Sequence, residues 1–512
     1  MRRLNIVALT IIAISFANIL AQYLGQGSIQ NYLVNSDTLF WPTLLSDTLA
    51  KGGSLTDWPL PPAPYFFPDL AIFLISYLAG LGPHFQLLTF AVVQTALMLV
   101  ALWLLAIRTA TPNPLFSAVF IVATLSYLAL SSNKPFDFSS SGPFVLMLVS
   151  VFHFGIFITS LFFLSLWLKI TDLNVEQTKY FFNTSLMAIL AFLSAISDSF
   201  FITQTIIPLT AMALGQALIG RRAIRQGIQK PLMITLLATT AGFLGVNLLT
   251  SMTTRPSPHV GITGCWKRLS NIVDLFLSVV AVYPIFALVF LSYLVIVAMS
   301  ARRFFTAPDS LSKFDWLSVF SLLSILSTIA ALLLLTNMPP IGARYLVPLY
   351  FWPVIMVALF AGRCFRRRFV PTTVAISVLM MTPLTVGSYE LFQSRRLNSD
   401  YYPGEIACID GALENTNARN GLAQYWDARY LQNFSKLKLN VAQYSVSLDQ
   451  MNFFTSKKYF RQNYDFAISS GNVNNAWQIP VDALIHVGGQ PTLVKRCGSR
   501  TIYLFKKDSL HP

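Results

Sequence analysis

The sequence predicts a polytopic α-helical membrane protein that ends in a small α/β domain. Of its 512 residues, 54% are hydrophobic and only 11% are charged, and the mean hydropathy is +0.59. A soluble domain carries about 25% charged residues, so this chain has too few to cover a water-facing surface of its size. Charge content becomes ordinary only from residue 388 onward. We therefore expect a membrane core over 1–387 and a separate domain over 388–512.

The membrane core contains twelve apolar runs that are candidate spans. A helix needs about 20 residues to cross roughly 30 Å of hydrocarbon. The first run follows Met1-Arg2-Arg3 and lacks a good small-x-small cleavage site, so we expect an uncleaved anchor rather than a signal peptide. The runs lie near residues 4–22, 66–82, 86–107, 115–131, 143–168, 180–197, 200–219, 231–250, 275–299, 316–336, 345–361 and 369–387.

Basic clusters predict how these spans are oriented. Positive residues gather at the ends of apolar runs, which is typical of cytoplasmic loops and argues against nucleic acid as a partner, despite a pI near 9.7. The N-terminus is then cytoplasmic, and loops 23–65, 251–274 and 337–344 face outward with 388–512. Twelve crossings would return the C-terminus to the cytoplasm, so we expect 11 or 13, with the miscount in 66–131. The clusters are Arg221-Arg222-Ala-Ile-Arg225, Arg302-Arg303, and Arg363 with Arg366-Arg367-Arg368.

Two outward segments stand out from the spans. The first loop, 23–65, is long and rich in proline, aromatic and acidic residues, and loops of this length without regular structure are usually functional. The C-terminal domain alternates short β-rich runs with segments compatible with helices. It contains Cys408 and Cys497, which are candidates for a disulfide outside the cytoplasm. Two free buried thiols are the alternative.

Acidic residues are scarce in the membrane core and therefore informative. An ionised carboxylate near hydrocarbon normally faces a cavity, a partner or a substrate. Helix capping is the alternative reading for each of them. We favour capping for Asp47 and Asp57, and a functional role for Asp37 and Asp69, which flank apolar aromatic sequence. Asp198 lies where a pair of helices turns outward, so both readings apply to it.

The basic candidates and one histidine follow the same logic. Arg344, next to Tyr345, lies at the outer mouth of a helix, where positive charge is disfavoured, and the planar guanidinium matches phosphate oxygens. Lys134 and Arg255 are weaker phosphate-binding candidates, for which contact with lipid headgroups is the alternative. His153 stands alone in an apolar run and serves either packing or function. No zinc-ligand spacing, Walker A motif or dinucleotide fingerprint is present.

The overall pattern resembles the GT-C superfamily of membrane glycosyltransferases. The resemblance rests on one helix followed by a long outer loop with an early aspartate, Tyr65-Phe-Phe-Pro-Asp69 leading into the next helix, Ala-Arg344-Tyr345, and an outer C-terminal domain. Such enzymes move a sugar from a polyprenyl-phosphate carrier to a lipid or glycan acceptor on the outer face of the membrane. Many members carry two adjacent carboxylates in the first loop, whereas Asn35-Ser-Asp37 offers one.

The resemblance implies a role for each candidate residue. Asp37 is expected to act as the general base of an inverting transfer, and Asp69 to position or tune the acceptor. Asp198 and His153 would help to bind the acceptor, and Arg344 with Tyr345 would grip the donor phosphate. No cofactor is expected, and a divalent metal stays open without support from ligand spacing. The protein would reside in the inner membrane of a bacterium, among membrane lipids.

Two rival functions come from other classes. A transporter or flippase for a lipid-linked saccharide would predict inverted repeats and charged residues at mid-membrane depth, and the sequence displays neither. A non-catalytic membrane scaffold with a partner-binding outer domain would leave the acid-rich first loop without a purpose.

Overall fold

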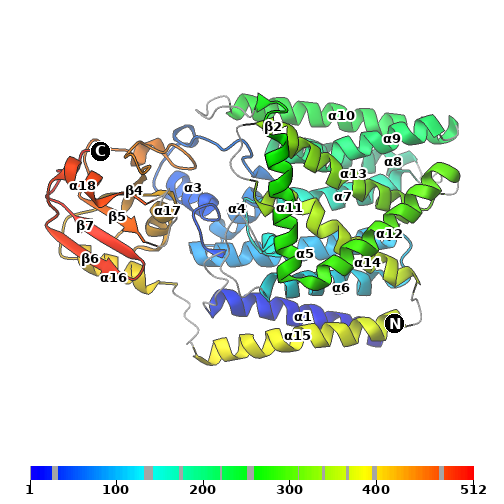
Figure 1. Ribbon diagram of the computed structural model, residues 1–512, viewed down its shortest axis with the longest axis horizontal. Helices are drawn as coiled ribbons and strands as arrows, with labels where there is room; N and C mark the ends of the chain where they lie inside the picture. The colour runs from blue at the N-terminus through cyan, green and yellow to red at the C-terminus, as the bar shows by residue number, and fades with distance from the viewer. Residues whose placement is uncertain are drawn as a thin grey trace.

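A computed structural model gives the fold and describes most of the chain. The described residues are 2–25, 33–131, 142–171, 177–219, 222–250, 259–308, 311–336, 341–364, 368–394, 401–471 and 478–512. Within them, a large helical part is followed by a small unit built on a β-sheet, and the two lie at opposite ends of the molecule (Figure 1). The predicted combination of a helical core and a small sheet domain near the C-terminus is confirmed at this level.

The helical part consists mainly of long helices that run along one common direction (Figure 1). Short 3-10 or π turns cover Ser46–Ala50, Leu55–Asp57, Phe66–Leu70, Pro143–Leu148, Ile202–Ile206 and Ala343–Leu346. The helices are α1 (Arg2–Leu24), α3 (Phe40–Leu45), α4 (Ala71–Leu78), α5 (Pro83–Arg108), α6 (Pro114–Leu130), α7 (Phe154–Ile170), α8 (Gln177–Ser197), α9 (Ile207–Ile219), α10 (Arg222–Thr250), α11 (Cys265–Val282), α12 (Pro284–Thr306), α13 (Lys313–Leu334), α14 (Val347–Cys364) and α15 (Phe369–Ser394).

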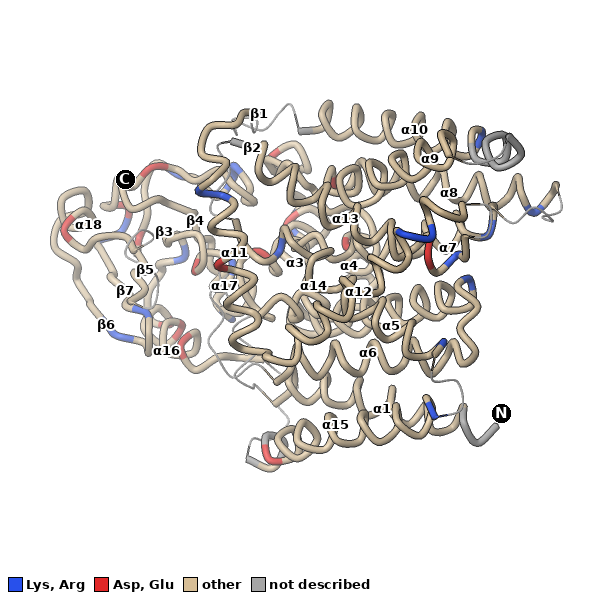
Figure 2. The backbone as a smooth tube through the Cα atoms, turned by 45° about the vertical axis from the view of Figure 1, so that its right-hand side comes forward, with Lys and Arg blue, Asp and Glu red and all other residues tan. Residues whose placement is uncertain are grey.

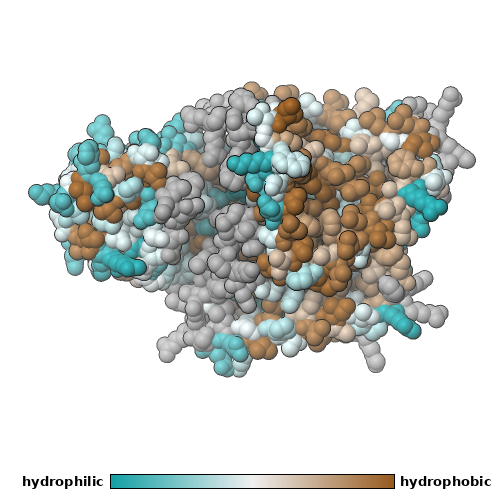
Figure 3. Space-filling model, viewed as in Figure 1, coloured by the Kyte–Doolittle hydropathy of each residue, from teal (hydrophilic) through white to brown (hydrophobic). Residues whose placement is uncertain are grey.

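Nine helical segments in the described chain are long and apolar enough to cross a membrane. These segments correspond to helices α1, α5, α8, α9, α10, α12, α13, α14 and α15. Helices α6 and α7 are apolar but have 17 residues each. Large apolar side chains such as Leu237, Leu248 and Leu379 stay exposed, and Figure 3 shows a broad hydrophobic face over the helical part, whereas hydrophilic residues gather on the sheet domain. This distribution is the one expected of helices that face lipid.

Three of the candidate spans need correction. The run 66–82 is interrupted, because only the eight residues of α4 follow the turn at Phe66–Leu70 as regular helix. The run 143–168 begins with a 3-10 turn, and its helix starts only at Phe154. The run 275–299 is divided between two helices at Pro284, whose ring fixes φ and removes an amide donor. Helix α11, before that break, lies across the direction of the other helices (Figure 1).

Basic side chains mark the end of the helical part that lies farthest from the sheet domain. Figure 2 shows a group of Lys and Arg there. Arg108 ends α5, Lys169 lies in the last turn of α7, and Arg303 and Arg363 lie in the last turns of α12 and α14. Arg303 pairs with the buried Asp315, at 3.1 Å. In the described residues, basic side chains therefore gather at the ends of apolar helices, as the sequence predicts.

The C-terminal unit is a five-stranded mixed sheet with three short helices. Strand order is β4-β3-β5-β7-β6, and β3 pairs in parallel with both β4 and β5, while the other pairs are antiparallel. Cys408 and Cys497 form a disulfide between α16 and the end of β6. The elements are α16 (Gly404–Leu413), β3 (Asn420–Ala423), α17 (Tyr425–Phe434), β4 (Asn440–Gln443), β5 (Phe466–Ser470), α18 (Val481–Gly488), β6 (Leu493–Cys497) and β7 (Arg500–Leu504); outside this sheet, β1 (His259–Val260) pairs with β2 (Leu335–Thr336).

The segment 33–65 connects the two parts of the molecule. Its helix α3 is fully buried and packs against α17 of the sheet domain. The Phe40 ring lies 4.7 Å from that of Phe454 in an edge-on contact, and Asn433 donates to the hydroxyl of Thr43 at 2.7 Å. The first long loop is therefore held between the helices and the sheet domain, and its side chains line the junction between them.

Candidate functional site

Six of the sequence-predicted residues meet near the junction with the sheet domain. They come from the loop before α3, the turn before α4, the start of α7, the turn between α8 and α9, and the 3-10 turn before α14. All of them except Arg344 are buried, and the Arg344 side chain is 28% exposed. The six residues are Asp37, Asp69, His153, Asp198, Arg344 and Tyr345.

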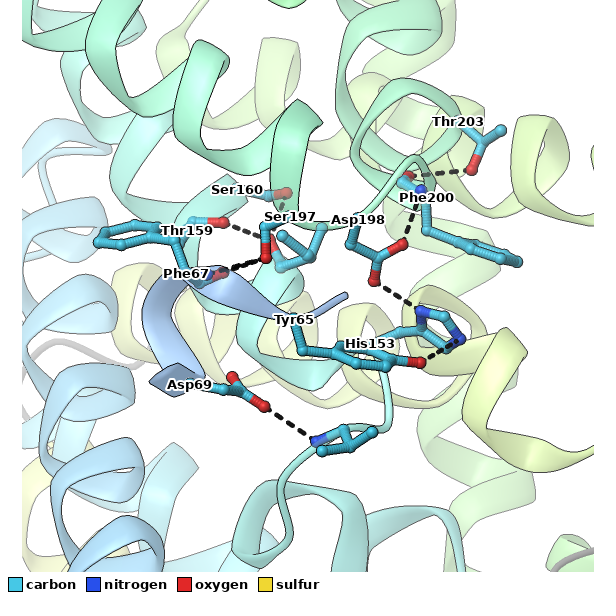
Figure 4. Close-up of polar contacts among 12 residues, drawn as sticks. Tyr65, Phe67, Asp69, His153, Thr159, Ser160, Ser197, Asp198, Phe200 and Thr203 are labelled. Carbon is cyan, nitrogen blue, oxygen red and sulfur yellow. Dashed lines mark hydrogen bonds and ion pairs between the residues drawn. The ribbon is translucent and has the colours of Figure 1, made fainter. Parts of the chain in front are cut away.

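The centre of the cluster is a buried carboxylate–imidazole pair. Nδ1 of His153 lies 2.5 Å from Oδ2 of Asp198, and neither side chain is more than 5% exposed (Figure 4). A carboxylate only accepts, so the pairing places a ring proton on Nδ1 and directs Nε2 the other way. The hydroxyl of Tyr65 lies 3.4 Å from that nitrogen. Asp198 thus orients an imidazole whose second nitrogen faces a phenol.

Asp198 also confirms part of the capping alternative. Its Oδ1 accepts a hydrogen bond from the backbone N–H of Phe200, at 3.0 Å, so the side chain caps the turn after α8 and holds His153 at the same time. Asp57 behaves as predicted, since it closes a capping box with Ser54. The prediction for Asp47 is wrong: its carboxylate accepts from the indole N–H of Trp58, at 2.9 Å.

Asp69 belongs to the neighbouring wall of the cluster. Its Oδ2 accepts from the backbone N–H of Val151, at 2.9 Å (Figure 4). The absence of a side chain at Gly155 makes this approach feasible, because a Cβ there would lie 2.7 Å from Oδ1 of Asp69. The segment before α7 therefore serves both carboxylates: Val151 binds Asp69, and His153 binds Asp198.

The backbone around these side chains is irregular. Tyr65, Val151 and His153 all adopt positive φ angles, of 56°, 68° and 63°. Residues other than glycine rarely do so, and such positions cluster at functional sites, where the surrounding structure enforces them. Two of the π turns, Phe66–Leu70 and Ile202–Ile206, lie directly beside the same cluster. π turns inside helices are also frequent at functional sites.

A second pair lies on the side of the sheet domain. Nη1 of Arg344 lies 3.4 Å from Oδ2 of Asp37, and the two residues are 307 positions apart in the chain. The other carboxylate oxygen of Asp37 accepts from the hydroxyl of Tyr425, the first residue of α17. Asp37 therefore does not cap a helix. Its carboxylate contacts Arg344, in the turn before α14, and Tyr425 of the sheet domain.

Aromatic rings connect the two pairs. The guanidinium of Arg344 lies 5.1 Å from the centre of the Tyr345 ring, within cation–π range. The Tyr345 ring in turn lies 5.2 Å from that of His153 and stacks on Phe200 at 5.6 Å. The two pairs form one continuous assembly, with a carboxylate and a cation at one end and a carboxylate-oriented imidazole at the other.

Two participants were not among the sequence candidates. Tyr65 lies in the stretch Tyr65–Asp69 that carries the resemblance, and Tyr425 lies in the C-terminal domain, but a tyrosine in an aromatic-rich chain gives no signal of its own. Burial, and then the nearby charge of Asp198, raises the pKa of Tyr65 well above its ordinary value of 10.0, and the positive charge of Arg344 only partly opposes this rise. Both phenols stay protonated and can donate. Lys134 and Arg255 lie outside the described residues.

The donor set does not indicate a metal centre. Among the described residues, no group of three His, Cys, Asp or Glu side chains is placed to hold an ion. Two surface pockets lie elsewhere: one of about 670 Å³ in the sheet domain, beside His486 and Asp449, and one of about 160 Å³ beside Arg303 and Asp315. The chemistry that the cluster offers is therefore proton transfer by a carboxylate or an imidazole, and anion binding by Arg344.

No protein-family model matches this chain, and no curated protein matches it significantly.

Proposed function

We propose that this protein is a membrane glycosyltransferase of the GT-C type, which moves a sugar from a polyprenyl-phosphate carrier to an acceptor on the outer face of a bacterial inner membrane. One observation carries the proposal. Asp37 and Arg344, which are 307 residues apart, pair beside the buried Asp198–His153 pair and Asp69, at the sheet-domain end of the helices. A base and a cation side by side are what transfer from a lipid phosphate requires.

The proposed topology has eleven crossings. Within the described residues, nine long apolar helices and the two 17-residue helices α6 and α7 give eleven, and α4, with eight regular residues, is too short to span. An odd number lets the N-terminus lie in the cytoplasm while residues 401–512 lie outside. The basic helix ends at Arg108, Arg303 and Arg363 favour the cytoplasm for the opposite side.

In the proposed reaction the acceptor hydroxyl attacks the anomeric carbon of the donor sugar. Its proton passes to Oδ2 of Asp37 as the new C–O bond forms. The bond between the anomeric carbon and the phosphate oxygen breaks, and its electron pair leaves with the polyprenyl phosphate, whose added charge Arg344 balances. Attack opposite the leaving group inverts the anomeric centre. Asp69, Asp198 and His153 position the acceptor, and Tyr345 lines the phosphate side.

The resting contact between Arg344 and Asp37 fits an ordered reaction. The 3.4 Å separation is long for a charge-assisted hydrogen bond, which is usually 2.7–2.9 Å. A donor phosphate would draw the partly exposed guanidinium away from Oδ2, because phosphate matches the planar fork of arginine. The carboxylate oxygen that acts as base would thus become free only when the donor is bound.

The test is sugar transfer by the purified protein in lipid nanodiscs. A panel of radiolabelled undecaprenyl-phosphate hexoses serves as donor, and total envelope lipid and glycan serves as acceptor. Asp37→Asn keeps the shape of the side chain and removes the base, so transfer should fall about 100-fold or more. Asp57→Asn is the matched control, since this carboxylate lies in the same loop, caps a turn and pairs with Lys458, which is not part of the cluster. Normal transfer by a folded Asp37→Asn protein would remove Asp37 as base.

A further inference from the structure

The sheet domain reaches into the cluster through the first residue of α17. The Tyr425 hydroxyl donates to Oδ1 of Asp37, and both residues are buried. Tyr425 and Asp37 are 388 residues apart. The contact is therefore made by the fold of the whole chain and does not follow from local sequence. It leaves the second oxygen, Oδ2, on the side of Arg344.

A dense set of bonds holds Tyr425 in this position. The hydroxyl of Ser36 donates to the backbone carbonyl of Tyr425, at 2.7 Å, and Arg429 donates to the backbone carbonyl of Ser36. Arg429 is fully buried, and both of its Nη groups donate hydrogen bonds while its Nε has no partner among the described residues. It also binds Gln443 at 2.9 Å and lies 5.0 Å from the centre of the Tyr425 ring. Ser36, the residue before Asp37, is thus tied to α17 by two hydrogen bonds.

The topology of the sheet explains why this residue is available. Strand β3 pairs in parallel with β4 on one side and β5 on the other, so the chain leaves its carboxyl end at a point where the strand order reverses. Such a point is where doubly wound sheets bind ligands. Tyr425 comes two residues after the end of β3. In this protein, the residue at that point, Tyr425, binds the carboxylate of Asp37.

The Tyr425 phenol is suited to hold a carboxylate without competing for its proton. Burial, and then the nearby charge of Asp37, raises the pKa of Tyr425 well above its ordinary value of 10.0. Its proton stays on the phenol oxygen at neutral pH. A donor fixed in this way locks the rotation of the carboxylate about its χ2 bond.

We propose that Tyr425 is a positioning residue of the membrane site: it holds Oδ1 of Asp37 so that Oδ2 points at the acceptor hydroxyl, and the outer domain thereby completes the catalytic centre. The inference rests on the proposed glycosyl transfer. It gives the outer domain a part in the chemistry, beyond any role in binding the acceptor. The phenol itself neither gains nor loses a proton during the reaction.

The test compares two Tyr→Phe variants of α17 in the same nanodisc assay. Tyr425→Phe removes only the hydroxyl that holds Asp37. Tyr430→Phe is the matched control, because Tyr430 lies on the same helix and its ring faces Phe434 and Arg500. We expect Tyr425→Phe to lower kcat 10- to 100-fold at an unchanged KM for the donor, and Tyr430→Phe to change kcat less than threefold.

Hydrogen exchange separates positioning from loss of docking. Amides 36–43 of the loop should keep their protection within threefold in Tyr425→Phe, because Arg429 and Ser36 still connect the two parts. Loss of that protection in proportion to the loss of kcat would overturn the inference, since the hydroxyl would then act only through docking. An unchanged kcat in Tyr425→Phe, with Asp37→Asn inactive, would overturn the inference and leave the proposed function standing. Full activity of Asp37→Asn would overturn both.

Discussion

The Asp198–His153 pair permits a quantitative prediction that does not depend on the reaction. Asp198 is completely buried and accepts two hydrogen bonds, one from Nδ1 of His153 and one from the N–H of Phe200. Replacing it with alanine leaves Nδ1 of the buried His153 and the N–H of the partly buried Phe200 without a partner. An unsatisfied buried donor costs about 1–3 kcal/mol. Asp198→Ala should therefore lower the free energy of unfolding by about 2–6 kcal/mol.

The complementary change removes the other partner. His153→Phe keeps an aromatic ring among Tyr65, Phe200 and Tyr345, but it leaves the Asp198 carboxylate with one donor. Removing one member of a buried pair costs about 3–5 kcal/mol. The double variant loses both members and strands only the Phe200 N–H, at about 1–3 kcal/mol. The double-mutant cycle should therefore give a coupling free energy of about 2 kcal/mol or more.

The assay is unfolding in mixed micelles, followed by tryptophan fluorescence, for the four proteins of the cycle. His84→Phe supplies the control partner, since His84 is also buried but stacks on Tyr401 at 4.3 Å. Combined with Asp198→Ala it should be additive within about 0.5 kcal/mol. If the Asp198/His153 cycle is equally additive, the pair does not couple, and the account of a carboxylate that orients the imidazole is refuted.

Two further predictions concern the neighbouring wall and the sheet domain. Gly155→Ala should destabilise the protein by about 1–3 kcal/mol, because the new Cβ would lie 2.7 Å from Oδ1 of Asp69 and 2.9 Å from Cδ of Pro68. Gly387→Ala is the control, because the space around Gly387 is open. Equal thermal stabilities of the two variants would contradict the tight contact at Gly155. Burial raises the pKa of Glu405, but hydrogen bonds from Ser499 and the charge of Arg500 outweigh burial and lower it below 4.5. When the pKa of a carboxyl is lower in the folded than in the unfolded state, its ionised form stabilises the fold above the unfolded-state pKa, and this stabilisation is lost as the pH falls through the folded-state pKa. Thermal stability should therefore decline below about pH 4.5, and Glu405→Gln should flatten this decline. An identical pH profile of thermal stability for both proteins would rule out the assignment.

The sequence alone determined the architecture in outline. Composition and the length of apolar runs depend only on neighbouring residues, and hydrophobic transfer is roughly additive along a helix, so the long apolar helices could be located without a fold. Errors occurred where a run was continuous in composition but broken in backbone. Pro284 divides one run, and the 3-10 turn Pro143–Leu148 shortens another. Hydropathy does not detect such breaks, because it reports residue polarity and not backbone conformation.

Single candidate residues were also accessible from the sequence, because a charge near hydrocarbon is costly and therefore rare. This argument selected Asp37, Asp69 and Asp198 individually, and the rarity of positive charge on the outer side selected Arg344. It could not tell which of them are partners, and it misjudged Asp47, whose carboxylate binds Trp58. His153 stood equally between packing and function until its 2.5 Å contact with Asp198 was known.

Only the tertiary structure decided the assembly of the site. The contact between Asp37 and Arg344 spans 307 residues, and that between Asp37 and Tyr425 spans 388. Both depend on how helices pack side by side and on where the sheet domain docks, which are collective outcomes of side-chain shape across the whole chain. The sequence shows which charged residues lie near lipid, and therefore where a free-energy cost arises. Which residue offsets that cost by pairing with the charge depends on the three-dimensional packing.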